Sequence, residues 1–534
     1  MLKSFKNRIN RTMSGFERFY PNHLRRFSVG FECSLFGTND YLNKPKRVLK
    51  SVLALAVAGL IIASSSVTVL ADTPYLGFTY DFWGFHTPTP VAYAPIMTIG
   101  ARDIDPELGD FFNPADLSSD QYGNIYVADS GNNRIVVFDQ NLNLIRVIDS
   151  FVVDGRPDSL NNPQGVFVSR DMRVHIADYG NRRVITLDEY DNFVRKIENP
   201  EFHDLEDAVD FRPLRVLVDR GGRTFVIVRH VFEGIMTFNA DGDFMGYFGT
   251  IDVTFNPLDM LWRFLSTREQ RARQALFIPT EFSAMDIDEY GFVFATNRDP
   301  HGGNMIQRLN PRGEDVLQNF NEDVEITGSQ NFRPVGHLSG PSIFTCVTAR
   351  SHGRYTVLDS VRGRVYTYDS EGNLLYAFSG TGNIVGMTRN PVAIEAVGES
   401  LLILDGHRGQ IIYFEETEYG SLINQAIMLR YDGDLGQAVL KWRQLLTIDE
   451  HFTLAHSGIG QSLLAAGEHA LAMEYLRRGM NIRYYSVALR RHRNDVMQES
   501  LNHILTGGLV MALGIAGYKT GKRFKKSNKG GENK

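Results

Sequence analysis

The sequence repeats a pairing of one aspartate with an arginine five residues later, and these are the first residue types that could do chemistry. The pairs are Asp129 with Arg134, Asp178 with Arg183, and Asp359 with Arg364. A catalytic group is needed once in a protein, whereas a structural device is needed in every repeat. We therefore interpret the pairs as structural turns of a repeated unit. Each aspartate is expected to accept hydrogen bonds from turn N–H groups and to face its arginine across a hairpin.

Histidines are the second set of residues that could do chemistry. His230, His301 and His407 fall in or near the equivalent turns of different repeats. Three imidazoles around one opening could bind a metal ion. Their spacing differs in each repeat and no partner carboxylate accompanies them, so we interpret them as exposed loop residues. The sequence also lacks a nucleophile elbow and a phosphate-binding glycine loop. We therefore assign no catalytic residue, no metal ligand and no cofactor.

The elements that would position these residues come from an internal repeat. The stretches that begin at Asn113 and Asn162 align without gaps, and Asp129 to Asp178 is a step of 49 residues. Each stretch contains short alternating apolar runs, such as IYVAD and RIVVFD, separated by turn residues. Such runs predict half-buried antiparallel strands. Four strands per unit at this period is typical of a β-propeller blade.

The two stretches resemble the NHL repeat in their residues. That repeat has the core Pro-x-Gly-hydrophobic, then Gly-Asn-hydrophobic-Tyr-Val-Ala-Asp, then Gly-Asn-x-Arg, and NPADLSSDQYGNIYVADSGNNRIVVF follows it closely. Looser units begin at Arg212, Glu281, Pro341 and Pro391. The resemblance implies a mainly β fold, with a six-bladed propeller over residues 91–417. The sixth unit lacks an obvious fourth strand, which residues 91–100 could supply, thereby closing the ring and removing an exposed edge.

The starts of the predicted innermost strands would line one mouth of the central channel. The polar residues at these starts are Asn113, Asn162, Gln164, Arg212 and Glu281. They could bind a polyhydroxylated or anionic ligand, such as a glycan. They could equally hold ordered water, because a channel of this kind needs a polar lining.

Irregular insertions all fall between predicted blades, and the longest contains a helical pattern over residues 257–276. Its apolar stripe consists of Leu258, Leu261, Trp262 and Leu265. The stripe could cap the ring. Alternatively, it could form the edge where a partner docks, since function often lies on loops over a rigid scaffold. Trp262 is the kind of side chain that anchors interfaces.

Residues 418–495 predict helices rather than strands. GDLGQAVLKWRQLLTI aligns with GEHALAMEYLRRGMNI, and Gly433 to Gly467 is a step of 34 residues. This unit resembles the tetratricopeptide (TPR) repeat, which has that period. An array of so few repeats leaves apolar helix faces exposed at its ends, and these need to pack against another surface. We therefore expect this small TPR-like domain to pack on the propeller or on a partner.

Both ends of the chain carry targeting signals. Residues 1–71 are interpreted as a long basic n-region with a signal peptide, and an uncleaved anchor is the alternative. Residues 72–90 are expected to be a linker. Residues 501–518 are apolar and glycine-rich, and residues 519–534 are basic, which favours a C-terminal transmembrane helix with a cytoplasmic tail. The alternative for 501–518 is a third TPR-type helix.

These features limit the possible functions. The formal net charge is -6, and the basic residues gather at the ends, so the body is acidic and nucleic acid is not an expected partner. We expect a single-pass cell-membrane protein with its main body outside the cytoplasm. It would bind or scaffold an envelope or membrane protein, or a glycan. The alternative is a propeller hydrolase or lyase acting on a small sugar-derived substrate, since some NHL-like propellers are lyases. Fold alone does not decide between these functions.

Overall fold

The computed structural model describes residues 73, 75–81, 85–200, 210–249, 281–298, 305–317, 328–329 and 342–529, with side chains to residue 523. The predicted signal region, the insertion at 257–276 and His301 lie outside these residues.

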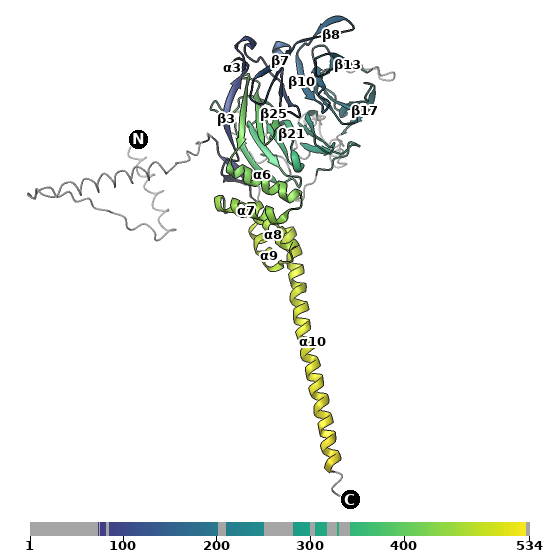
Figure 1. Ribbon diagram of the computed structural model, residues 1–534, viewed down its shortest axis with the longest axis vertical. Helices are drawn as coiled ribbons and strands as arrows, with labels where there is room; N and C mark the ends of the chain where they lie inside the picture. Colours follow the sequence, from purple (N-terminus) through teal and green to yellow (C-terminus); the bar gives the residue numbers. More distant parts are fainter. Residues whose placement is uncertain are drawn as a thin grey trace, which may run out of the picture. The chain divides into compact units, whose positions relative to one another are not determined.

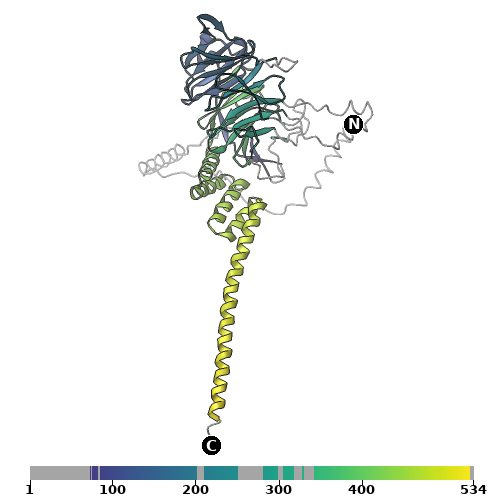
Figure 2. The same cartoon turned by 90° about the vertical axis from the view of Figure 1, so that its right-hand side faces the viewer.

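The described chain forms the predicted six-bladed β-propeller, built from antiparallel sheets (Figures 1 and 2). Blade one is β4 (Asp116–Ser119), β5 (Ile125–Asp129), β6 (Arg134–Phe138) and β7 (Leu144–Ile148). Blade two is β10 (Pro163–Val168), β11 (Val174–Asp178), β12 (Arg183–Leu187) and β13 (Phe193–Ile197). Blade three is β14 (Pro213–Val218), β15 (Thr224–Val228), β16 (Ile235–Phe238) and β17 (Phe244–Phe248).

The remaining blades are less regular. Blade four is β18 (Phe282–Ile287), β19 (Val293–Asn297) and β20 (Ile306–Leu309) within the described residues. Blade five is β21 (Phe344–Ala349), β22 (Tyr355–Asp359), β23 (Arg364–Tyr368) and β24 (Leu374–Ser379). Blade six is β25 (Pro391–Val397), β26 (Ser400–Asp405), β27 (Gln410–Glu416) and β3 (Tyr93–Gly100). Short helical turns connect some of the strands: α3 (Ala101–Ile104), η1 (Pro106–Leu108), η2 (Ser130–Asn132) and η3 (Ser351–Gly353).

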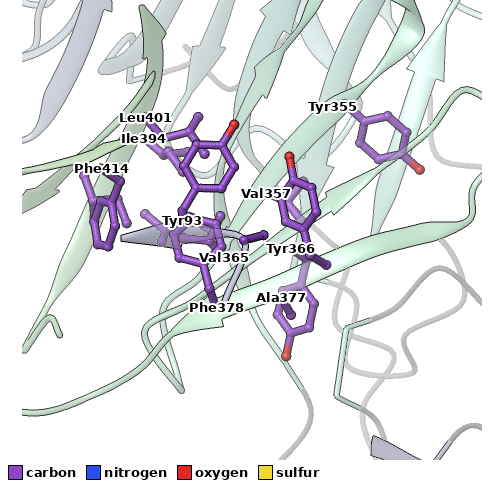
Figure 3. Close-up of a cluster of buried hydrophobic side chains, with 14 of the residues drawn as sticks. Tyr93, Tyr355, Val357, Val365, Tyr366, Ala377, Phe378, Ile394, Leu401 and Phe414 are labelled. Carbon is purple, nitrogen blue, oxygen red and sulfur yellow. The ribbon is translucent and has the colours of Figure 1, made fainter. Parts of the chain in front are cut away.

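The N-terminal strand closes the ring, as predicted. β3 pairs antiparallel with β27, from Gly100 opposite Gln410 to Tyr93 opposite Glu416. The side chain of Tyr93 stacks on Phe378 of β24 at 5.1 Å between ring centroids, and Phe414 of β27 lies 5.3 Å from Phe378 (Figure 3). The closing strand is therefore held by backbone pairing and by the shared core of blades five and six.

Two segments hold strands that their sequences did not predict. Residues 72–90, which we expected to be a linker, contain β1 (Gly77–Tyr80) and β2 (His86–Thr89), which extend blade five beyond β24. Phe78 of β1 packs edge-on against Tyr366 and stacks on His86. The connection after blade one is a second hairpin, β8 (Ser150–Val153) with β9 (Arg156–Ser159), which turns at Asp154 and Gly155 with φ of 51° and 77°. Four-residue strands carry too short a pattern to be read with confidence from sequence.

Four antiparallel helices follow the propeller. They are α6 (Glu418–Tyr431), α7 (Leu435–Ile448), α8 (Thr453–Ala465) and α9 (His469–Arg478). Thr417 and Asp434 cap the first two through their side-chain oxygens, as expected at helix N-termini. Gly433 and Gly467 occupy equivalent turns with φ of 84° and 85°. The 34-residue step therefore repeats a helix–turn–helix unit, while the TPR assignment itself stays a prediction.

A buried polar network joins α6 to the propeller. Tyr376 donates from its hydroxyl to Asn424 Oδ1 at 2.9 Å, and Asn424 Nδ2 donates to the hydroxyl of Tyr93 at 3.2 Å. Arg350 donates to the same Tyr93 hydroxyl at 2.9 Å. Because buried polar groups need partners, this network fixes one position of α6 on blades five and six.

The last helix, α10, is continuous from Ile482 to Lys529 (Figure 1). Its first turns pack against the helical unit, where Ala488 is buried beside Leu464 and Leu476. From Leu501 onward its apolar side chains are exposed. This exposed part is long and apolar enough to cross a membrane. The 48 residues of α10 would extend about 72 Å, because each residue of an α-helix rises about 1.5 Å.

Candidate functional site

The axis of the propeller holds a cavity of about 710 Å³. It is lined by the C-terminal halves of the innermost strands, which are β4, β10, β14, β18, β21 and β25. The cavity opens at the turns that lead from these strands to the second strand of each blade. Such a volume suits a small-molecule ligand, since ligand pockets commonly measure about 300–1,000 Å³.

One register position defines the floor of this cavity. This position lies on the innermost strand of each blade, opposite the penultimate residue of the second strand. It corresponds to the glycine of the Pro-x-Gly motif. In chain order it is occupied by Asp116, Gly165, Arg215, Ala284, Cys346 and Ala393. Most blades have a small residue at this position, because the inner strands converge around the axis. Blades one and three instead carry an acid and a base.

Two further carboxylates lie two residues beyond this position. They are Asp286 of β18 and Glu395 of β25, and both line the cavity. Residues two apart on a strand point to the same side. The repeat therefore brings Asp116, Asp286 and Glu395 to one site, although they are far apart in sequence.

Each carboxylate accepts a hydrogen bond from the inner strand of the next blade. Val166 N donates to Asp116 Oδ2 at 3.1 Å, and Ala349 N donates to Asp286 Oδ2 at 2.7 Å. Ser119 donates to Glu395 Oε1 from its backbone at 3.0 Å and from its hydroxyl at 2.6 Å. The inner edge of a propeller strand has no neighbouring strand, so its N–H groups need such acceptors. The acids thus accept hydrogen bonds from backbone N–H groups at the inner edge of the ring.

Burial changes the protonation of these acids. Desolvation raises the pKa of Asp116 to about 6, against the lowering effect of Arg215. Desolvation also raises the pKa of Asp286 to about 6, with a further increase from the charge of Asp116. The pKa of Glu395 is raised well above its ordinary value, first by desolvation and then by the charge of Asp286. Desolvation likewise raises the pKa of the Cys346 thiol to about 12. Perturbed groups gathered in a cavity are typical of functional sites.

Arg215 separates this cavity from the opposite mouth of the channel. Its guanidinium donates to the carbonyl of Gln164 at 2.6 Å and to that of Ala115 at 3.2 Å, so it reaches from blade three to blades two and one. Its Nε lies 3.5 Å from Asp116 Oδ1. Arg215 lines both the 710 Å³ cavity and a pocket of about 480 Å³ on the other side.

That other side holds most of the residues predicted at the strand starts. Asn113 and Gln164 line the 480 Å³ pocket, and Asn162, Gln164 and Glu281 line a neighbouring pocket of about 370 Å³. Arg212 is absent from both linings. It pairs with Asp210 at 2.5 Å, and its guanidinium stacks on the ring of Tyr179. The structure therefore brings four of the five candidates to one mouth, while the buried charges lie toward the other.

The first two Asp–Arg pairs lie in turns and make local contacts. Arg134 Nε donates to Asp129 Oδ2 at 2.8 Å, and Arg183 Nε donates to Asp178 Oδ2 at 2.8 Å. The other oxygen of each aspartate accepts a backbone N–H, from Phe112 and Asn161 respectively, at 2.8 Å.

The third pair departs from this geometry. Asp359 accepts hydrogen bonds from Ser342 Oγ at 2.7 Å and from Val361 N at 2.8 Å. Arg364 donates to Ser329 Oγ at 3.1 Å, and its guanidinium lies over the ring of Phe78. Arg364 therefore contacts the β1–β2 hairpin, whereas Arg134 and Arg183 bind the aspartates of their own turns.

Other candidates from the sequence can be placed only in part. The stripe Leu258, Leu261, Trp262 and Leu265 lies outside the described residues. His230 and His407 follow β15 and β26 in different blades. Within the part of the chain that the structure describes, no group of three or more His, Cys, Asp or Glu side chains has the geometry to hold a metal ion.

Sequence reasoning missed Asp116, Arg215, Asp286 and Glu395. Their signal was present as single charges inside apolar strand patterns, in ADLSS, LRVLV, AMDI and AIEAV. The search for polar residues stopped at the strand starts, whereas the buried charges lie further along the same strands.

The sheets and the repeated blade turns define a six-bladed β-propeller. Residues 111–138, which include most of blade one, match the family model described as "NHL repeat". No curated protein matches the chain in sequence.

Several solved structures are similar in fold. A streptogramin B lyase has 12% sequence identity, covers 61% of this chain and 98% of its own, and gives a TM-score of 0.37. Virginiamycin B lyase from Staphylococcus aureus has 9% identity, with coverages of 60% and 99% and a TM-score of 0.37. Hydrazine synthase from Kuenenia stuttgartiensis has 8% identity, with coverages of 58% and 96% and a TM-score of 0.35. Similarity at this level transfers no activity to this chain.

Proposed function

We propose that this chain is a membrane-anchored binding protein whose body lies outside the cytoplasm and whose propeller holds a small polar ligand in the axial cavity. The observation that carries the proposal is the floor of that cavity. At the floor position Asp116 and Arg215 are charged where the other blades use small residues, and Asp286 and Glu395 lie two residues beyond that position. Burying such groups is unfavourable. Groups that reduce stability at one site of a repeat are typical of function.

Binding is favoured over catalysis by how the acids are held. Each one accepts a backbone N–H from the neighbouring blade, so its position is fixed by the ring. A hydrolase or lyase would need a group free to transfer a proton at the reacting atom. The cavity instead presents acids that the ring holds in position and an apolar wall that includes Val166 and Ile394.

The helical unit contacts the propeller close to the end at which the cavity opens. The turn that holds η3 follows β21, at the end of the blade where the cavity opens. His352 in that turn lies 3.4 Å from Asp432 and packs edge-on against Tyr431 at the end of α6. We propose that the TPR-like helices and the insertion at 257–276 each dock an envelope protein.

The test uses the full chain, purified in detergent. Small polar compounds are screened by equilibrium dialysis, and each hit is repeated with Ala240→Trp, which places an indole at the cavity rim. Ala240 is exposed, so the fold should tolerate the change. The matched control is Ala465→Trp, at an exposed end of α8. Hits that Ala240→Trp weakens and Ala465→Trp does not would support the proposal. Hits that bind equally to both variants would contradict it.

A further inference from the structure

The floor of the axial cavity carries more negative than positive charge. Arg215 is the one basic side chain there among the described residues, and it is shared between Asp116 and three backbone carbonyls. Within the described chain, Asp286 and Glu395 form no ion pair. Asp286 accepts from backbone N–H groups and from Thr348, and among the described residues Glu395 accepts only from Ser119. Two carboxylates therefore face the cavity with neutral partners.

A second, independent observation concerns Ser118. This residue of β4 is 7% exposed and lines the cavity. Its hydroxyl forms no hydrogen bond to any residue that the structure describes. Because Ser118 lies two residues after Asp116, both side chains point to the same side of the strand. The Ser118 hydroxyl therefore opens onto the cavity without a protein partner, beside the carboxylates, where it is available to a polar group of a ligand.

The walls and the rim limit what that ligand can be. The apolar lining includes Val166, Phe167 and Val216, so the ligand has an apolar part. The rim carries arginines, among them Arg173 and Arg220. These would repel an extended polycation. A single positive charge at one end of a compact molecule satisfies both limits.

We propose that the axial cavity binds a small organic cation, with an ammonium group between Asp286 and Glu395 and an apolar body against the wall. The inference rests on the proposed function, because it names the ligand class of the same cavity. An ammonium group has three donors and no acceptor. It can therefore bind to both carboxylates and to the Ser118 hydroxyl at once.

A matched series of probes tests the charge alone. 2-Phenylethylamine, 2-phenylethanol and 3-phenylpropionate share a similar body and differ in having an ammonium, a hydroxyl or a carboxylate head. Each is titrated by calorimetry into the full chain in nanodiscs at pH 7.5, with empty nanodiscs as the reference for partitioning into lipid. We expect the amine to bind at least about tenfold more tightly than the alcohol, because a hydrogen bond between charged groups contributes more than the ~1.4 kcal/mol that a tenfold change represents. The carboxylate should bind most weakly.

Variants locate the effect. Glu395→Gln and Asp286→Asn each keep the shape and remove one charge, and each should weaken amine binding at least about tenfold. The matched control is Glu198→Gln, which removes an exposed charge that pairs with Lys196 outside the cavity. Each variant is first checked for an unchanged circular dichroism spectrum, and if one does not fold the other carries the test.

The outcomes separate this inference from the proposed function. If amine and alcohol bind equally and Ala240→Trp weakens both, the proposal of a cationic ligand is wrong, but the cavity remains a binding site. Amine binding that neither Glu395→Gln nor Asp286→Asn changes would also overturn the cation. If the amine does not bind at 10 mM, on the order of the dissociation constant of a very weak site, the cation proposal is overturned as well. The dialysis test would then show whether the cavity binds any small ligand.

Discussion

The buried acid Asp286 should make the propeller less stable at neutral pH than it would be without that charge. Burial raises the pKa of Asp286 from 3.8 to about 6, so the folded chain holds this proton more tightly than the unfolded chain does. Between these values the folded state binds more protons, and stability therefore falls as the pH rises from about 4 through about 6. Above that range the full penalty is present.

The size of the effect follows from the two pKa values. A difference of one pKa unit corresponds to 1.36 kcal/mol, so the rise from 3.8 to about 6 corresponds to about 3 kcal/mol. This figure is an upper bound, because Asp286 is partly open to the cavity. Asp286→Asn cannot ionise. It should therefore be more stable than the natural chain at pH 8, by up to about 3 kcal/mol, with little difference at pH 4.

The assay is chemical unfolding of the full chain in detergent at pH 4, 6 and 8, followed by tryptophan fluorescence. Glu198→Gln is the control, and it should match the natural chain at every pH because its carboxylate is exposed. The reasoning is refuted if Asp286→Asn is less stable than the natural chain at pH 8, or if the difference is the same at all three pH values. Either result would mean that Asp286 is charged in the folded state without penalty.

Three further predictions concern the blade turns, the topology and the partner surface. Asp178→Ala should destabilise the propeller by about 1–3 kcal/mol in the same unfolding assay, because Asn161 N–H would lose its acceptor; unchanged stability with lost ligand binding would reverse the structural interpretation. A reporter fused after Lys534 should be active in the cytoplasm, with the propeller open to protease from outside the cell; a soluble, untethered chain would contradict the membrane anchor. Trp262→Ala should reduce the set of proteins that co-purify from solubilised membranes; a sharply lower melting temperature with the same set would show that the insertion is core.

The sequence predicted the propeller because blades repeat a strong local pattern. The middle strands, such as β5 and β11, are buried along their whole length, and tight turns such as those at Asp129 and Asp178 separate them. The closing strand was also predictable, since the sixth unit lacked a partner for β27. Residues 77–89 were not predicted to extend blade five, because a hairpin of four-residue strands is specified by long-range packing of Phe78 rather than by its own pattern.

The candidate site was predictable only in part, for a geometric reason. Strand starts such as Asn113 and Gln164 follow directly from the repeat, and they do gather at one mouth. The cavity floor depends on which residues meet across the axis, from blades separated by hundreds of residues. A single sequence gives the register within each blade but no measure of how close Asp286 comes to Glu395.

The distinction between repeated and unrepeated residues is the reason why we propose the floor, rather than the turns, as the functional site. An aspartate at the end of the second strand recurs in blades one, two, five and six, where it holds the turn. The floor position shows the opposite behaviour, because Gly165, Ala284 and Ala393 suffice there in other blades. The fold therefore does not require Asp116 or Arg215 at that position. Charges that burial makes unfavourable therefore lie near a position that small residues fill in other blades, and a ligand in contact with that floor would account for them.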